Sequence, residues 1–193
     1  MSTAADNLIG KTKQALAGRI PERLQRDDAV PAAVLILLYE KDYQTHVVLT
    51  ERSHDVQHHK GQIAFPGGSW EPEDPNLQTT ALRETFEEVG VLPGHVELVG
   101  QLDDIYTVSN FVVTPMVGLL TGPVPYPFVP LPREVATVLE VPLPHLMDER
   151  NVTLEQYERA GQAVLLPTYA WNEYRVWGAT AVLLQKLLGI LES

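Results

Sequence analysis

Residues 63–91 read IAFPGGSWEPEDPNLQTTALRETFEEVGV, a succession of a short apolar run, a glycine pair, an acidic loop and a helical pattern. The run Ile63-Ala64-Phe65 predicts a short strand that stops at Pro66-Gly67-Gly68. The pattern from Leu77 to Val89 predicts a helix, and Gly90 is the residue type expected just after its last turn. The stretch therefore predicts a strand, a glycine turn and a helix within a single mixed unit.

The predicted helix carries an apolar face and an acidic face, because residues on a helix are spaced by about 100°. The apolar residues are Leu82, Phe86 and Val89. The glutamates are Glu84, Glu87 and Glu88. Carboxylates at these spacings repel one another, and the C-terminal end of a helix also disfavours negative charge. Arg83 cannot neutralise all three, whereas a divalent cation can. For an isolated motif, an acidic face in solvent would be the better interpretation.

The composition limits which metal and which partners are reasonable. The chain has 193 residues, no cysteine and a formal net charge of −11 at pH 7. Oxygen and imidazole are therefore the available ligands, and a hard cation such as Mg²⁺ is the natural expectation. The negative charge argues against nucleic acid as a bulk partner.

Outward from this stretch, the pattern predicts further elements on both sides. We expect an N-terminal helix over residues 5–18, a hairpin from residues 32–39 and 45–50, and strands over 96–102 and 111–120. The pattern also predicts a proline-rich loop over 122–132, a strand over 134–141, a short helix over 142–147, one or two strands over 164–177 and a closing helix over 179–191. Asp103-Asp104 is interpreted as a strand-end turn rather than a second metal site.

Strands interleaved with a few helices favour an α/β class, a mixed α+β sandwich, over a doubly wound parallel sheet. We expect residues 1–28 to form an N-terminal helical extension packed on a domain of residues 29–193. No secretory signal or membrane-spanning run is visible, so the expected location is cytoplasmic, without a membrane partner. The oligomeric state stays open.

The glycine pair and the helix together resemble the Nudix box, whose generic pattern is G-x5-E-x7-R-E-U-x-E-E-x-G-U with U a bulky apolar residue. Gly68, Arg83-Glu84, Glu87-Glu88, Gly90 and Val91 match it. Asp74 stands at the first acidic position, the gap to Arg83 is one residue longer, and Thr85 replaces an apolar residue.

This resemblance implies a Nudix-like α/β/α sandwich around a mixed central sheet, and metal-dependent hydrolysis of a diphosphate bond. It implies that Glu84, Glu87 and Glu88 bind Mg²⁺ or Mn²⁺, with the carbonyl of Gly68 as a backbone ligand. Arg83 is expected to orient a glutamate, and Asp74 is a weaker candidate for steadying Arg83 or the loop. The proton of the attacking water goes to Glu84 or, as the alternative, to a loop acid such as Glu134.

Two further stretches resemble the coenzyme A diphosphatases, a Nudix subfamily with the same lengthened box. They are residues 49–53, Leu-Thr-Glu-Arg-Ser, with 61–68, Gly-Gln-Ile-Ala-Phe-Pro-Gly-Gly, and the C-terminal residues 174–181, Tyr-Arg-Val-Trp-Gly-Ala-Thr-Ala. The pattern has an arginine where this chain has Gln57, and a leucine where it has Val48. The resemblance implies cleavage of coenzyme A into 3′,5′-ADP and 4′-phosphopantetheine.

The basic residues nearest the glycine pair are the candidates for binding this substrate. They are Arg52, His58, His59 and Lys60, joined by the backbone of Gly67 and Gly68. For the histidines alone, a solvated loop is an equal interpretation, since they are mostly neutral at pH 7. Trp70, Trp171 and Trp177 are candidates for stacking an adenine, although packing is the commoner role of such residues.

Three alternatives compete with this interpretation. In the first, the chain is a Nudix hydrolase of another substrate: ADP-ribose, a dinucleotide cofactor such as NADH, or a nucleotide sugar. In the second, it is a nucleotide-binding module without turnover. In the third, it is an acidic interaction domain without a ligand.

Overall fold

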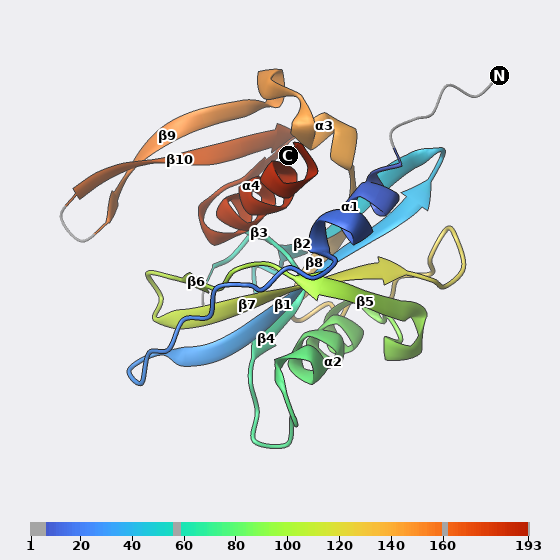
Figure 1. Cartoon of the computed structure of the whole chain (residues 1–193), viewed down its shortest axis with the longest axis horizontal. Coiled ribbons are helices and arrows are strands. Elements are labelled where there is room, and N and C mark those ends of the chain that lie inside the picture. The colour runs from blue at the N-terminus through green and yellow to red at the C-terminus, as the bar shows by residue number, and fades with distance from the viewer. Residues whose placement is uncertain (1–6, 56–58, 160–161, 193) are drawn as a thin grey trace.

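The computed structural model describes residues 7–55, 59–159 and 162–192, and its backbone is drawn in Figure 1. A central sheet is built on two long strands, β1 (Val30–Lys41) and β2 (Gln44–Arg52), which form an antiparallel hairpin. The other strands of this sheet are β3 (Ile63–Ala64), β4 (Gly67–Ser69), β5 (Val96–Gln101), β6 (Ile105–Tyr106), β7 (Phe111–Leu120) and β8 (Val135–Pro142).

The central sheet is mixed, because β1 and β7 run parallel while its other pairings are antiparallel. The order is β3-β2-β1-β7-β5, with β4 paired to β1, β6 to β7 and β8 to β2. The start of β1, the end of β2, and the short strands β3, β4 and β6 all meet at one end of the sheet.

Helices cover both faces of this sheet. In Figure 1, α2 (Leu77–Val89) lies below it, and α1 (Leu8–Leu16) and α4 (Gly178–Glu192) lie above it. Two hydrophobic cores result, one between the sheet and α4 and one between the sheet and α2. The predicted mixed α/β/α sandwich is confirmed by this layering.

A second, three-stranded sheet lies beside α4. Its strands, in the order β11-β10-β9, are β9 (Val152–Arg159), β10 (Gln162–Trp171) and β11 (Tyr174–Val176). Figure 1 shows β9 and β10 extending beyond the first turn of α4. Short helical segments complete the chain: α3 (Leu143–Met147) and two 3₁₀ turns, Pro93–His95 and Glu149–Asn151.

Local sequence signals predicted most of these elements correctly. The helix Leu77–Val89 and the strand Phe111–Leu120 have the expected bounds, and the hairpin, the closing helix and the short helix α3 are present. Strands β4, β6 and β9 were not predicted. β4 and β6 are too short to carry a two-residue periodicity. β9, with the sequence VTLEQYER, carries few apolar residues, and its described side chains are half or fully exposed.

In the described ranges, no helix combines the length and the apolar character that crossing a membrane requires.

Candidate active site

The helix α2 begins and ends with standard capping interactions, which set its position relative to the sheet. The side chain of Asn76 accepts a hydrogen bond from the Thr79 N–H at 3.0 Å. At the other end, Gly90 adopts a left-handed φ of 74° and its N–H donates to the carbonyl of Phe86 at 2.9 Å. The predicted helix stop at Gly90 is therefore confirmed.

The face that α2 turns to the sheet differs in part from the predicted one. Ala81, Thr85 and Glu88 are buried against the sheet, whereas Phe86 is 46% exposed. Val89 is buried and Leu82 packs against the core, as predicted. The prediction was wrong for Phe86, which was expected to pack, and for Glu88, which was expected on the opposite, acidic side. Small side chains on this face allow α2 to approach the sheet closely. They are Ala81 and Thr85, whose hydroxyl donates to the Ala81 carbonyl at 2.7 Å.

The glycine pair lies directly against this helix, in β4. Gly67 pairs with Val34 and Gly68 with Ala33. A Cβ atom on Gly67, whose φ is 152°, would lie 2.3 Å from the Ala33 carbonyl oxygen, and one on Gly68 would lie 2.5 Å from the carboxylate of Glu84. Only glycine fits these positions without displacing a neighbour.

Glu88 is a buried carboxylate at the centre of this contact. It is 5% exposed, and its Oε2 accepts a hydrogen bond from the Gly67 N–H at 3.1 Å. Burial raises the pKa of Glu88 to about 8, against the opposing effects of the Gly67 N–H and of Arg52. Burial also raises the pKa of Glu84, and the negative charges of Glu84 and Glu134 add to the effect on Glu88.

Arg83 connects the helix to the acidic loop before it. Its Nε and Nη2 donate to the two carboxylate oxygens of Asp74 at 3.1 and 2.9 Å, and Nη2 also donates to the carbonyl of Ser69 at 3.2 Å. Its Nη1 donates to Glu84 at 3.0 Å and to Glu87 at 3.4 Å. Hydrogen bonding by Arg83 lowers the pKa of Asp74 to about 2. Asp74 and Arg83 thus tie the loop, β4 and α2 together.

Arg52 lies at the end of β2, on the border of the site. Its Nη1 lies 4.0 Å from Oε1 of Glu88, and its Nε is buried with no hydrogen-bond partner among the described residues. The backbone N–H of Ser53 donates to the carbonyl of Glu134 at 2.8 Å, which holds the loop after β7 beside Arg52. Glu134 therefore borders the same site, from a segment about 50 residues beyond the glutamates in the sequence.

The donor groups of this site fit a hard divalent cation. Within the described ranges, no three acidic or histidine side chains already converge at metal-binding distances. Hydrogen bonds to Arg83 hold Glu84 and Glu87, while the Gly67 N–H holds Glu88. Carboxylate oxygens are nevertheless the ligands that Mg²⁺ and Mn²⁺ prefer. Among the described residues, an ionised Glu88 has one cationic partner, Arg52 at 4.0 Å.

Other predicted residues lie elsewhere. His59 and Lys60 are exposed on the loop between β2 and β3, and Nδ1 of His59 lies 2.8 Å from Oε1 of Gln62. Gln57 and His58 fall outside the described residues. The contact of Gly67 with Glu88 was not foreseen, and no signal in the sequence would have identified the carboxylate it meets.

Comparison with known proteins gives one family and a consistent set of relatives. Residues 29–163 match the NUDIX domain. A protein of Photorhabdus laumondii, described as an uncharacterized Nudix hydrolase, NudL, is 36% identical over 167 residues, which cover 86% of this chain and 87% of that protein. A NudL of Escherichia coli O7:K1 is 37% identical over 158 residues, covering 81% and 80% of the two chains.

Solved structures share the fold at low sequence identity. A NUDIX hydrolase from Alicyclobacillus acidocaldarius superposes with a TM-score of 0.53 at 17% identity, covering 86% of this chain and 93% of that one. RenU, a Nudix hydrolase from M. smegmatis, gives a TM-score of 0.51 at 19% identity, with 61% and 73% coverage.

Proposed function

This chain belongs to the Nudix hydrolase family, whose members hydrolyse diphosphate bonds, and we propose that its substrate is coenzyme A or an acylated or oxidised form of it. The products are then 3′,5′-ADP and 4′-phosphopantetheine. The observation that carries this proposal is Arg52, which belongs to the coenzyme A-type stretch 49–53 and lies 4.0 Å from the buried Glu88. Its buried Nε, without a partner in the described structure, is suited to a phosphate oxygen.

We propose that Glu84, Glu87 and Glu88, with the carbonyl of Gly68, hold Mg²⁺ or Mn²⁺. A bound cation of this kind neutralises diphosphate oxygens and lowers the pKa of a bound water. Binding requires Glu84 and Glu87 to exchange their bonds to Arg83 for the cation. The bidentate contact of Arg83 with Asp74 supports this exchange, because it keeps the guanidinium in position.

The water that attacks phosphorus must lose a proton, and we propose Glu84 as the group that accepts it. Burial already raises the pKa of Glu84 above the ordinary glutamate value, which favours proton acceptance. Glu134 remains the alternative, because it borders the same site and affects the pKa of both Glu84 and Glu88.

On the substrate side, Arg52 and the backbone at Gly67 and Gly68 are the proposed contacts with the diphosphate. The loop residues His58, His59 and Lys60 are proposed contacts with the 3′-phosphate, an interaction that Gln57 in place of arginine weakens. We also propose that residues 29–193 form the hydrolase domain and that residues 1–28 are an extension of it.

The experiment that tests the substrate compares turnover of several diphosphates by the purified chain with Mg²⁺ or Mn²⁺. We expect the highest kcat/KM for coenzyme A among coenzyme A, ADP-ribose, NADH and a nucleotide sugar, with both products identified by mass. Rapid cleavage of another diphosphate while coenzyme A stays intact would reject the substrate proposal. Nucleotide-dependent thermal stabilisation without cleavage of any of them would favour a binding module instead.

A further inference from the structure

Two aromatic rings lie stacked on the second sheet. The ring planes of Tyr157 in β9 and of Trp177, which follows β11, are inclined by only 3°, and their centroids are 6.1 Å apart. The Tyr157 hydroxyl donates to Glu155 at 3.1 Å, and Glu155 also pairs with Arg175. The pair is therefore held in a defined orientation, yet Trp177 remains 38% exposed.

Strand register assigns this pair to the face of the second sheet that turns away from α4. Tyr169 and Val176 are paired and buried in the core that contains α4. Residues alternate between faces along a strand, so Arg175 points to the other face, and Trp177, the residue after β11, stacks on Tyr157 of β9. Tyr157 pairs with Val164, and Val164 is also out of phase with Tyr169. The aromatic pair thus lies on the face of the second sheet opposite to the one that packs on α4.

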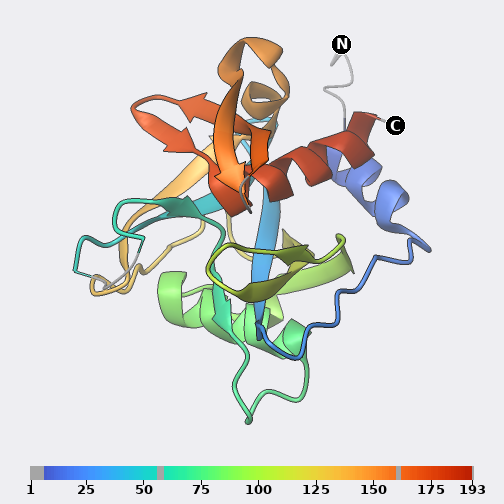
Figure 2. The same cartoon turned by 90° about the vertical axis from the view of Figure 1, so that its left-hand side faces the viewer.

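This face of the second sheet lies on the same side of the molecule as the loops of the candidate active site. Figure 2 shows the second sheet and the loop between β2 and β3 on one side, with α1 and the C-terminal end of α4 on the other. Cα atoms of β11 and β3 approach within 8 Å, and β3 pairs with Glu51, the neighbour of Arg52. The strand that precedes Trp177 therefore lies next to the strand that pairs with the end of β2, where Arg52 stands.

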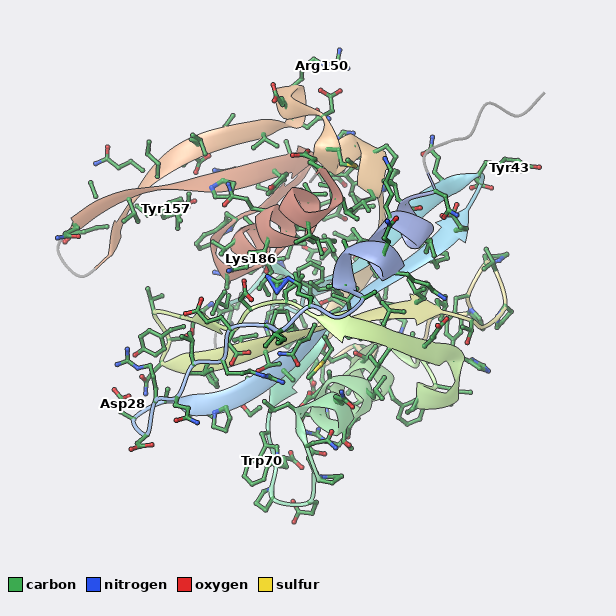
Figure 3. All side chains as sticks on the ribbon, in the orientation of Figure 1. Asp28, Tyr43, Trp70, Arg150, Tyr157 and Lys186 are labelled. Carbon is green, nitrogen blue, oxygen red and sulfur yellow. The ribbon has the colours of Figure 1, made fainter. Side chains whose placement is uncertain are left out.

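The other two tryptophans have structural partners that account for them. Trp171 packs against the core and stacks on Tyr174 with ring centroids 6.0 Å apart. Trp70 donates from Nε1 to the carbonyl of Asp74, and Figure 3 shows it on the loop that precedes α2, at the opposite end of the molecule from Tyr157. Trp70 is as exposed as Trp177, at 39% against 38%, but its indole N–H is hydrogen-bonded within its own loop, whereas Trp177 follows β11, the strand next to β3.

We propose that Trp177, backed by Tyr157, is a stacking surface for the nucleobase of the diphosphate substrate. This inference rests on the proposed function in assuming that the substrate is a nucleoside derivative. A planar heteroaromatic base would cover the part of the indole that is exposed to solvent, and base–aromatic stacking needs only one accessible ring face. The diphosphate then lies toward Arg52 and the glutamates, and the base lies toward the second sheet.

Binding is tested without turnover by titrating the chain with the product 3′,5′-ADP and following tryptophan fluorescence. We expect 3′,5′-ADP to quench the fluorescence, Trp177→Leu to remove most of the quench and to weaken binding about 10-fold, and Trp177→Tyr to retain binding. Leu165→Ser is the matched control, because Leu165 is 63% exposed on the opposite face of the same sheet. It should bind like the unchanged chain.

The second readout is steady-state kinetics on coenzyme A. Trp177→Leu should raise KM about 10-fold and leave kcat within about 2-fold, because a stacking contact is present equally in the ground state and the transition state. Unchanged quenching and unchanged KM in Trp177→Leu would overturn the proposal. Quenching by 4′-phosphopantetheine and not by 3′,5′-ADP would also overturn it, because the surface would then hold the pantetheine half of coenzyme A.

The two proposals fail separately. If 3′,5′-ADP binds through Trp177 while coenzyme A is not cleaved, the stacking surface stands and the substrate is a different nucleoside diphosphate derivative. If coenzyme A is cleaved and Trp177→Leu changes neither binding nor KM, the proposed function stands and the stacking surface does not.

Discussion

Glu88 combines two properties that rarely occur together, a carboxylate side chain and nearly complete burial. At 5% exposure its neighbours are the Gly67 N–H and, at 4.0 Å, Arg52. A buried carboxylate without a full counter-charge takes up a proton more readily, which is why the pKa of Glu88 is raised to about 8. A cation bound in place of this proton would offset the free-energy cost of burying the charged carboxylate.

The first prediction concerns Glu88→Gln. Glutamine keeps the side-chain volume but removes the charge, so Mg²⁺-dependent turnover should fall at least about 1000-fold while the fold persists. Mg²⁺ should raise the Tm of the unchanged chain, and by more as pH rises from about 6 toward 8, because the cation competes with the proton on Glu88. Calorimetry with and without Mg²⁺ measures the rise in Tm and its dependence on pH. Retained turnover in the variant would contradict the assignment of Glu88.

Asp74 is the opposite case, a buried acid with a complete partner. Its side chain is 4% exposed and receives two hydrogen bonds from Arg83, which lower its pKa from 3.8 to about 2. A lowered pKa in the folded state means that the unfolded chain binds the proton more tightly. The contribution to stability is therefore complete above pH 3.8 and is lost as the pH falls through about 2.

The second prediction follows from the lowered pKa of Asp74. At neutral pH, Asp74→Asn should lower the free energy of unfolding by about 2 kcal/mol, and this difference from the unchanged chain should shrink as the pH falls from about 4 to about 2. Urea titrations across that range measure it. Glu73→Gln, which changes an exposed acid in the same loop, is the control and should stay within about 0.5 kcal/mol of the unchanged chain. A difference that stays constant with pH would argue against the Asp74–Arg83 pair as its source.

At the scale of elements, the contact between β4 and α2 decides the geometry of the site. The strand is three residues long, and its glycines let the helix approach until Glu84 touches the Gly68 backbone. The sequence indicated a glycine turn at this position. It did not indicate a strand, because three residues provide too little pattern to recognise one.

The third prediction is that Gly68→Ala displaces the Glu84 carboxylate, because the added Cβ would lie 2.5 Å from it. We expect kcat to fall about 100-fold, the usual effect of misplacing a catalytic group by about 1 Å. The flexible end of Glu84 absorbs the clash, so Tm should change by only a few degrees. Gly94→Ala, where an added Cβ meets no atom within 4 Å, is the matched control. Equal activity of the two variants would show that this close contact is not needed.

At the scale of the whole molecule, Asp103 and Asp104 attach the N-terminal segment to the sheet. Asp103 accepts hydrogen bonds from both Nη atoms of Arg19, at 3.0 and 2.9 Å. It also forms a salt bridge with Lys186 of α4 at 3.5 Å. Asp104 accepts hydrogen bonds from the Leu24 N–H at 3.0 Å and from the Thr114 hydroxyl at 2.8 Å. The sequence predicted only a turn here. The two residues instead connect three parts of the chain.

The fourth prediction is that Asp104→Ala costs about 2–4 kcal/mol, because it leaves the fully buried Thr114 hydroxyl and the Leu24 N–H without their acceptor. In a chain of this size, Tm should fall by roughly 5–15 °C. Thermal denaturation measures the loss, and Asp27→Ala, at an exposed position in the same segment, serves as control. A loss no greater than that of the control would mean that the N-terminal segment is held by other contacts.

The sequence by itself determined the features that depend on neighbours along the chain. The bounds of α2, its stop at Gly90, the β1–β2 hairpin and the group of acids around Arg83 follow from capping, periodicity and spacing, which act within a few residues. The family resemblance rests on the same short stretch.

The tertiary structure alone decided which face of α2 is buried, that Glu88 meets the Gly67 N–H, and that Arg52 and Glu134 border the same site. It also stacked Tyr157 on Trp177 across a sheet that the sequence only partly indicated. These contacts join residues that are distant in sequence. Burial and charge compensation depend on what packs opposite a side chain, and local periodicity carries no information about that partner.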